Sequence, residues 1–141
     1  LCYPGTILST KAAREVLPKE LSLKHSIRFA NMLSRFVSAL YCQDETEAFA
    51  ALQDLVAEPA RLPLIPELTP IRAALMAEGI GHVGISGAGP TLFAVCQTPA
   101  LAEQAAAYLR THYEKNQDAM THICTLEQQG ARVLSNQSVQ D

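Results

Sequence analysis

The sequence predicts an α+β domain whose first half is helical and whose second half supplies an antiparallel sheet. Up to about residue 79, apolar residues recur every three or four positions, which is the period of a helix. Short apolar runs bounded by glycine and proline follow, and these are typical of strands. The length of 141 residues fits a single domain, and 48% hydrophobic with 18% charged residues is a globular composition.

The first elements are short. Residues 1–8 are expected to be extended. Ser9 or Thr10 can then cap a helix that continues to about Val16, because a hydroxyl at this position accepts a hydrogen bond from an otherwise unpaired backbone amide. Leu17-Pro18 is expected to end this helix.

The longest helix is predicted from about Lys24 to Cys42, with apolar and polar residues on opposite stripes. The apolar stripe contains Phe29, Leu33, Phe36, Val37 and Leu40, and the polar stripe contains Arg28, Asn31, Arg35 and Ser38.

A third helix is expected from Asp44 to near Glu58. Asp44 and Glu47 resemble a capping box, and Pro59 lacks the amide that would continue the helix. Residues 61–66 are predicted to form an irregular connection, because they contain two prolines.

A fourth helix is predicted to begin at Thr69-Pro70, or slightly earlier near Glu67, and to end at Gly79. Proline suits the first turn of a helix, and glycine suits the left-handed residue that follows the last turn.

The remainder is predicted to place strand pairs on both sides of one helix, giving an antiparallel sheet with helices on one face. The expected order is a strand over residues 80–86, a turn over 87–90, a strand over 91–96, a helix from Thr98-Pro99 to about His112, strands over 120–126 and 131–134, and a frayed polar tail from Ser135.

Charge and cysteine spacing exclude several classes of function. A net charge of −3 argues against nucleic acid or an anionic membrane as partner, and no apolar run reaches the ~20 residues of a membrane-spanning helix. Residues 1–35 carry a net charge of +4, which suits an anionic ligand or reflects solvated helix faces. The four cysteines lie at least 28 residues apart, so we expect free thiols in the cytoplasm and no metal site.

The glycine-rich stretch is the most informative segment, because five of the seven glycines lie within residues 79–91. Glycine permits positive φ, and successive amides can bind an anion, although a turn without any ligand has the same composition. The stretch lacks the Gly-Lys-Ser/Thr sequence of a Walker loop.

No catalytic acid or base is predicted, because the spacing of His25, His82, His112 and His122 brings no two of them together locally. His82 precedes the glycines, and we expect it either to line a cleft or to lie in the core.

Residues 84–94, Gly-Ile-Ser-Gly-Ala-Gly-Pro-Thr-Leu-Phe-Ala, resemble the third, C-terminal motif of the GHMP kinases. Further blocks are similar to homoserine kinases within that superfamily. These blocks are Tyr3-Pro4-Gly5, Ser9-Thr10-Lys11-Ala12-Ala13-Arg14 with Leu17-Pro18, Glu58-Pro59-Ala60-Arg61 with Leu64-Ile65-Pro66, and His122-Ile123-Cys124 with Gly130-Ala131-Arg132-Val133-Leu134.

The resemblance implies a ferredoxin-like four-stranded antiparallel sheet, with residues 1–141 forming the acceptor-binding C-terminal domain. It implies transfer of the γ-phosphoryl group of ATP to the hydroxyl of L-homoserine, in threonine biosynthesis in the cytoplasm. ATP and Mg²⁺ would be bound mainly by an N-terminal half that this chain lacks. The chain begins at Leu1 without a signal-peptide pattern, and we expect it to be a piece of a longer protein that is inactive alone.

The resemblance also assigns site residues. Arg14 and Arg61 match the substrate-binding arginines, and Ser86, Gly87, Ala88 and Gly89 form the phosphate-proximal glycine loop. A guanidinium group suits the α-carboxylate of homoserine. Lys11 is the weaker candidate for a cation. The alternative for each arginine is a solvated surface position.

Two other functions fit the same residues. A non-catalytic amino-acid sensor would enclose its own pocket, and a dimerisation domain would expose one large apolar patch away from the glycines. The kinase hypothesis predicts instead that Arg14, Arg61 and the glycine loop converge on one open edge. It also predicts homo-oligomers of the isolated domain, because the face toward the missing half would be exposed.

Overall fold

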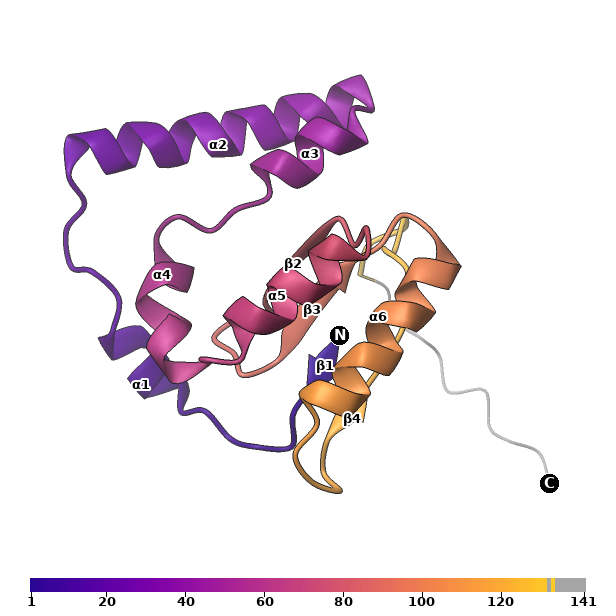
Figure 1. Ribbon diagram of the computed structural model, residues 1–141. Coiled ribbons are helices and arrows are strands. Elements are labelled where there is room, and N and C mark those ends of the chain that lie inside the picture. The colour runs from indigo at the N-terminus through magenta and orange to yellow at the C-terminus, as the bar shows by residue number, and fades with distance from the viewer. Residues whose placement is uncertain (132, 134–141) are drawn as a thin grey trace.

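The computed structural model describes residues 1–131 and 133, and it confirms an α+β fold. Within this part of the chain, four strands form one antiparallel sheet in the order β2-β3-β1-β4. The strands are β1 (Cys2–Tyr3), β2 (His82–Ile85), β3 (Leu92–Val95) and β4 (Met120–Thr121). Helices α5 (Leu68–Ala77) and α6 (Pro99–His112) cover one face of the sheet (Figure 1).

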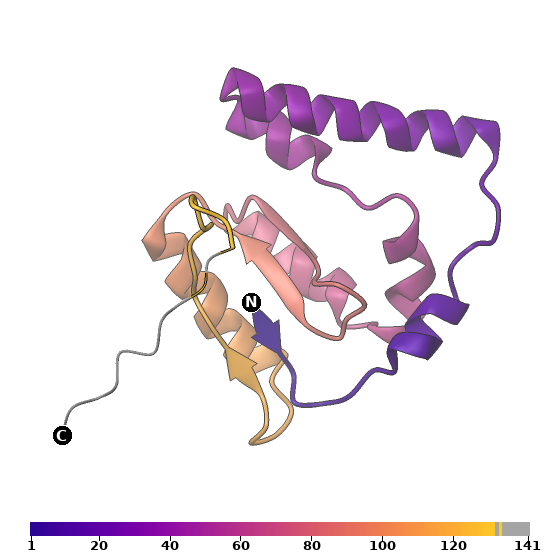
Figure 2. The same ribbon diagram turned by 180° about the vertical axis from the view of Figure 1, so that it is seen from behind.

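The register of the sheet separates two faces. Val83 pairs with Ala94, and Cys2 pairs with Leu92, so these residues point toward the helices. Gly84 pairs with Phe93, and both point toward the opposite face of the sheet. This face is turned toward the viewer in Figure 2, which shows the molecule from behind. Successive strand residues point to opposite faces. Cys2, Val83 and Leu92 are fully buried in the main core, and Ala94 is partly buried against it.

The predicted strands at the C-terminal end are wrong in extent. β4 ends at Thr121, and Ala131 and Val133 are not in a strand; residues 132 and 134, and the tail from residue 135, lie outside the described residues. The fourth strand is β1, which inserts between β3 and β4. A strand needs a hydrogen-bonding neighbour along its length. Because β1 has two residues, it supports only a short β4.

The first two helices follow their local capping signals. The Ser9 hydroxyl accepts a hydrogen bond from the Ala12 amide, and α1 spans Thr10–Glu15. The Ser22 hydroxyl accepts from the His25 amide, and α2 spans Leu23–Cys42. Both helices lie close to their predicted ranges.

The predicted helix from Asp44 to Glu58 is wrong, because the segment contains two helices. α3 (Glu45–Ala51) is capped by Asp44 as expected, but α4 (Ala57–Arg61) starts anew. The Asp54 carboxylate accepts hydrogen bonds from the amides of residues 56, 57 and 58 and so begins α4. Pro59 therefore occupies the first turn of a helix, where its missing amide is not needed.

The connection after α4 is also more regular than predicted, since residues Leu62–Leu64 form the 3-10 helix η1. α5 begins near the earlier of the two predicted starts, with Pro70 in its first turn. It ends before Gly79, which has a φ of +85°. α6 begins as predicted, with the Thr98 hydroxyl accepting from the Leu101 amide.

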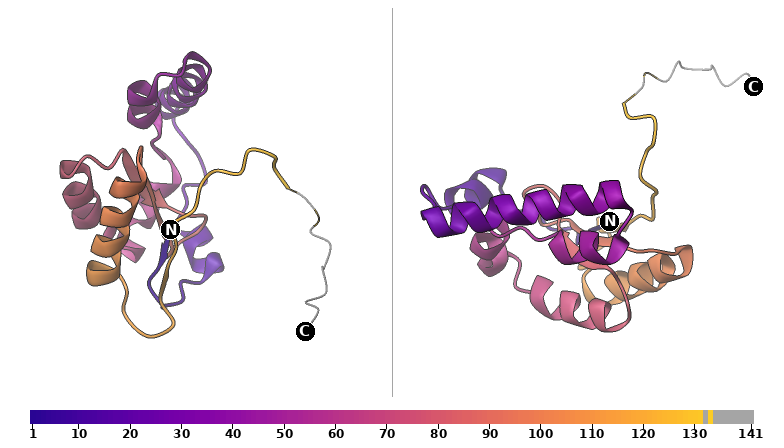
Figure 3. Two further views of the ribbon diagram at one scale, coloured as in Figure 1. Left: turned by 90° about the vertical axis from the view of Figure 1, so that its right-hand side faces the viewer. Right: turned by 90° about the horizontal axis from the view of Figure 1, so that it is seen from above.

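The main core lies between the sheet and helices α5 and α6, and α2 lies outside it. Figures 1 and 3 show α2 beside α3, with which it makes its main contacts. Only Met32 and Ala39 of α2 are buried, while Leu33 is 53% exposed. The main core contains Cys2, Ile65, Leu68, Ile71, Leu75, Ile80, Val83, Leu92, Ala105, Leu109 and Tyr113.

All four cysteines are free thiols, as predicted. None of the helices in the described residues has the length and apolarity needed to cross a membrane.

The separation between the core and α2 predicts unequal effects of one substitution. Leu68→Ala removes a fully buried side chain from α5 and should lower the free energy of unfolding by about 3 kcal/mol. Leu23→Ala is the matched control, because this leucine is also helical but is 77% exposed. Urea denaturation measures both values, and equal losses would contradict the assigned core.

Candidate functional site

The glycine-rich turn joins β2 to β3. The Ser86 amide donates to the Thr91 carbonyl at 2.8 Å, and the Gly89 amide donates to the Ser86 carbonyl at 3.2 Å. Gly87 and Gly89 have φ values of +63° and +82°, so glycine is the favoured residue at both positions. The Tyr113 hydroxyl donates to the Pro90 carbonyl and ties the turn to the end of α6. The turn is therefore a fixed feature of the fold.

Arg61 connects this turn to α1. Its Nε donates to the Ala13 carbonyl at 3.1 Å, and its Nη1 donates to the Gly87 carbonyl at 3.0 Å. Arg61 is the last residue of α4, so its side chain joins three segments that are distant in the sequence. A guanidinium group can do this because its donors form a planar fork.

Arg14 follows Ala13 directly and lies near the end of α1, where it is exposed. Among the described residues, no hydrogen bond or ion pair is found for its side chain. The backbone next to Arg14, the guanidinium of Arg61 and the glycine turn thus meet at one place. The predicted role of both arginines in substrate binding stays a prediction. Nζ of Lys11 lies 3.9 Å from Oε1 of Glu15, and this ion pair is largely exposed.

Sequence reasoning missed a second guanidinium bridge. Arg72 of α5 donates to both carboxylate oxygens of Glu58 and to the Val83 carbonyl. The available signal was an arginine within an otherwise apolar helix, Ile71-Arg72-Ala73-Ala74-Leu75. Such a residue needs a partner for its charge if the helix packs against a sheet.

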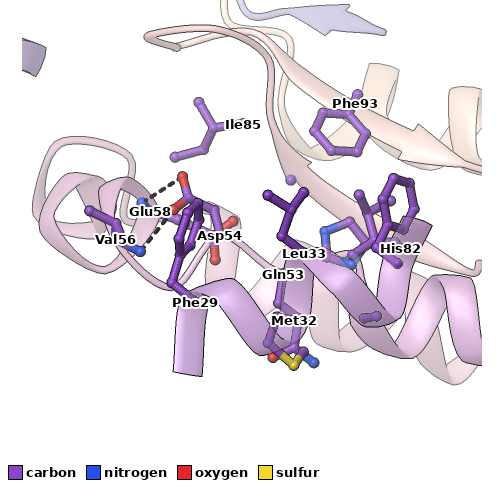
Figure 4. Close-up of a pocket in the computed structure, with 14 residues that line it drawn as sticks. Phe29, Met32, Leu33, Gln53, Asp54, Val56, Glu58, His82, Ile85 and Phe93 are labelled. Carbon is purple, nitrogen blue, oxygen red and sulfur yellow. Dashed lines mark hydrogen bonds between the residues drawn. The ribbon is translucent and has the colours of Figure 1, made fainter. Parts of the chain in front are cut away.

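A cavity of about 510 Å³ lies between α2 and the sheet face opposite the core (Figure 4). Its lining is mostly apolar and includes Phe29, Met32, Leu33, Phe36, Ile85 and Phe93. The carboxylates that reach it are engaged, because Asp54 accepts from backbone amides and Glu58 accepts from Arg72. The lining contains no lysine or arginine, so this cavity does not suit an acceptor carboxylate.

His82 lines this cavity and is 8% exposed. Its ring centroid lies 5.8 Å from that of Phe93, and Figure 4 shows the two side chains on the same side of the cavity. Burial lowers the pKa of His82, and the positive charge of Arg72 lowers it further, against a smaller opposing effect of Glu58. The imidazole is therefore held in its neutral form near pH 7.

Within residues 1–131 and 133, no group of three or more His, Cys, Asp or Glu side chains is arranged to hold a metal ion.

Two comparisons with known proteins are informative. The family model described as "GHMP kinases C terminal" matches residues 36–115, which is more than half of the chain. The chain is also similar to the crystal structure of homoserine kinase from Cytophaga hutchinsonii, with 28% sequence identity and a TM-score of 0.75. That match covers 79% of this chain and 36% of the other, so this chain spans about a third of the length of that enzyme. The chain belongs to the GHMP kinases.

The geometry of the turn predicts different costs for alanine at its two glycines. A Cβ at Gly87 would meet open space, so Gly87→Ala should cost about 1 kcal/mol for the positive φ alone. A Cβ at Gly89 would lie 2.5 Å from Cδ1 of Ile65, which is buried, so Gly89→Ala should cost more. Urea denaturation compares the two, and an equal loss would show that Ile65 does not constrain the turn.

The environment of His82 predicts a pH dependence of stability. Because its folded-state pKa is lower than the ordinary value of 6.5, the unfolded chain binds the proton first as the pH falls. The stability that neutral His82 provides is present above about pH 6.5 and is lost as the pH falls through its folded-state pKa. The free energy of unfolding of His82→Gln should therefore fall less than that of the wild type between about pH 7 and about pH 5. Parallel pH curves would contradict this interpretation.

Proposed function

We propose that this member of the GHMP kinase family forms the acceptor-binding part of an enzyme that transfers the γ-phosphoryl group of ATP to the hydroxyl of L-homoserine. The observation that carries the proposal is the position of Arg61, between the α1 backbone beside Arg14 and the turn at Gly87. Similarity to a homoserine kinase over 79% of the chain supports the choice of acceptor. The reaction belongs to threonine biosynthesis in the cytoplasm under this proposal.

The acceptor is bound by its charges. Homoserine is a small zwitterion, and its α-carboxylate accepts charge-assisted hydrogen bonds from guanidinium groups. Nη2 of Arg61 makes no hydrogen bond to any of the described residues. Arg14 is exposed, and it directly follows Ala13, whose carbonyl accepts from Arg61. These two side chains have the donors that the carboxylate needs. The apolar cavity beneath α2 is not the acceptor site under this proposal.

The turn containing Ser86, Gly87, Ala88 and Gly89 borders the place where the phosphoryl group is transferred. Phosphoryl transfer depends mainly on positioning of the reactants and on neutralising charge. The rigid turn positions the acceptor through Arg61, whose Nη1 it holds at the Gly87 carbonyl. When bound, ATP would supply the phosphoryl group and Mg²⁺ would neutralise its charge. An N-terminal half outside this chain would hold both, so the chain alone would be inactive.

One alternative is favoured by a separate observation. Leu23, Ile27 and Leu40 of α2 are each more than half exposed, which suits self-association through this helix. Dimerisation through α2 is compatible with acceptor binding, because the hydrogen bonds of Arg61 join α1, α4 and the glycine turn and do not involve α2. We therefore retain a homo-oligomer as a second property of the domain.

The proposal predicts selective loss of acceptor binding in the full-length enzyme that contains this chain. Arg61→Ala and Arg14→Ala should each raise KM for L-homoserine by roughly tenfold to a hundredfold, because each removes a hydrogen-bond donor to a carboxylate. KM for ATP should change by less than about twofold. Steady-state assays of ADP release measure both constants.

Arg110→Ala is the matched control, since Arg110 lies exposed in the last turn of α6. It should leave both Michaelis constants unchanged. An Arg61→Ala enzyme with the wild-type KM for homoserine would refute the assignment of that residue.

A further inference from the structure

Arg72 connects three elements through one planar group. Its Nη1 and Nη2 donate to Oε1 and Oε2 of Glu58 at 2.8 and 2.5 Å, and its Nε donates to the Val83 carbonyl at 2.7 Å. The side chains of Arg72 and Glu58 are only 25% and 13% exposed. A two-bond contact between guanidinium and carboxylate fixes orientation as well as distance. Arg72 therefore fixes α4 relative to both α5 and β2.

The helix that Arg72 holds is too short to keep its place alone. α4 has five residues, and a single helical turn is not stable in isolation. The Asp54 carboxylate caps its beginning, and Glu58, in its first turn, attaches it to Arg72. Arg61 follows Glu58 by three residues, which places the two side chains on neighbouring positions of the helix surface. A displacement of Glu58 would therefore displace Arg61.

The two guanidinium bridges act on the same pair of elements. Arg72 ties α4 to β2 at Val83, and Arg61 ties α4 to Gly87, in the turn that follows this strand. The Arg72 bridge thus sets the distance between α4 and the glycine turn, which the Arg61 side chain must span. Arg61 can donate to the Ala13 and Gly87 carbonyls together only while α4 keeps this separation.

The other ion pairs of the described residues are more exposed. Arg35 and Glu47 join α2 to α3 with side chains that are 45% and 37% exposed. This pair is also an arginine–glutamate ion pair, joined by one hydrogen bond instead of two, and among the described residues Arg61 makes no hydrogen bond to either of its helices. It provides a matched control for the general effect of breaking an Arg–Glu pair.

We propose that Glu58 and Arg72 are positioning residues for Arg61. They hold α4 against β2, so that Arg61 keeps its two backbone acceptors and directs its remaining donors to the acceptor carboxylate. This inference rests on the proposed function for its catalytic consequence. Its structural part concerns Arg61 alone and can be tested separately.

The first experiment measures the Arg61 side chain by NMR in this chain, through the resonance and hydrogen exchange of its Nε–H group. Glu58→Gln and Arg72→Lys should shift this resonance and speed its exchange, because the Ala13 hydrogen bond is no longer held. Glu47→Gln should leave it unchanged. Arg72→Lys keeps the charge and so tests the pair if Glu58→Gln does not fold. A wild-type Arg61 signal in every folded variant of the pair would overturn the proposal.

The second experiment measures kinetics of the full-length enzyme. Glu58→Gln and Arg72→Lys should raise KM for L-homoserine by roughly tenfold or more, with KM for ATP within about twofold, because a small misplacement of a binding group is costly. In an Arg61→Ala background, Glu58→Gln should raise KM by less than about twofold further, since Arg61 already mediates the effect. Independent, multiplying effects would overturn the proposal.

The two experiments separate the two proposals. If the full-length enzyme does not phosphorylate homoserine, the proposed function fails, and the NMR measurement still decides whether the pair positions Arg61. If the enzyme is active but the Arg61 resonance does not depend on the pair, the function stands and the positioning proposal fails.

Discussion

The hydrogen bonds from Arg61 to the carbonyls of Ala13 and Gly87 are the interaction on which the proposed site depends. They bring together α1, the end of α4 and the glycine turn, none of which contributes a complete binding surface. Both acceptors are backbone carbonyls, so these two hydrogen bonds use no side-chain atom of Ala13 or Gly87. Because the guanidinium has further donors, it can hold the fold together and still bind an anion. A structural role and a binding role for Arg61 are therefore compatible.

The sheet topology places these segments at the same end of the domain. β1 pairs antiparallel with β3, so the end of β1 lies beside the beginning of β3, where the glycine turn is. The chain that leaves β1 reaches α1 near that turn, and α4 is held there by Arg72. The core beneath, which includes Leu68 and Leu92, keeps the sheet and α5 fixed. The sheet and α5 thus position the proposed site, and the hydrogen bonds of Arg61 and Arg72 hold its segments together.

The parts of the fold that depend on neighbouring residues could be predicted, and the parts that depend on distant ones could not. Ser9 and Thr98 cap their helices as their local sequences indicate. The rule that proline ends a helix failed at Pro59, because Asp54 begins a new helix just before it. β1 has two residues, and its pairing with β4 spans most of the chain, so no local pattern could reveal it. Resemblance to a family assigns Arg14, Arg61 and the glycine turn to the site. The hydrogen bonds of Arg61 to backbone carbonyls could not be predicted, because such bonds leave no pattern in the sequence.

The central claim is that the guanidinium groups recognise the carboxylate of the acceptor. The most direct test compares L-homoserine with its uncharged carboxamide as substrates of the full-length enzyme, in the wild type and in Arg61→Ala. The wild type should prefer homoserine in kcat/KM by roughly tenfold or more, and the variant should lose most of this preference. A wild-type enzyme that uses both acceptors equally well, or a variant that keeps the full preference, would contradict the account.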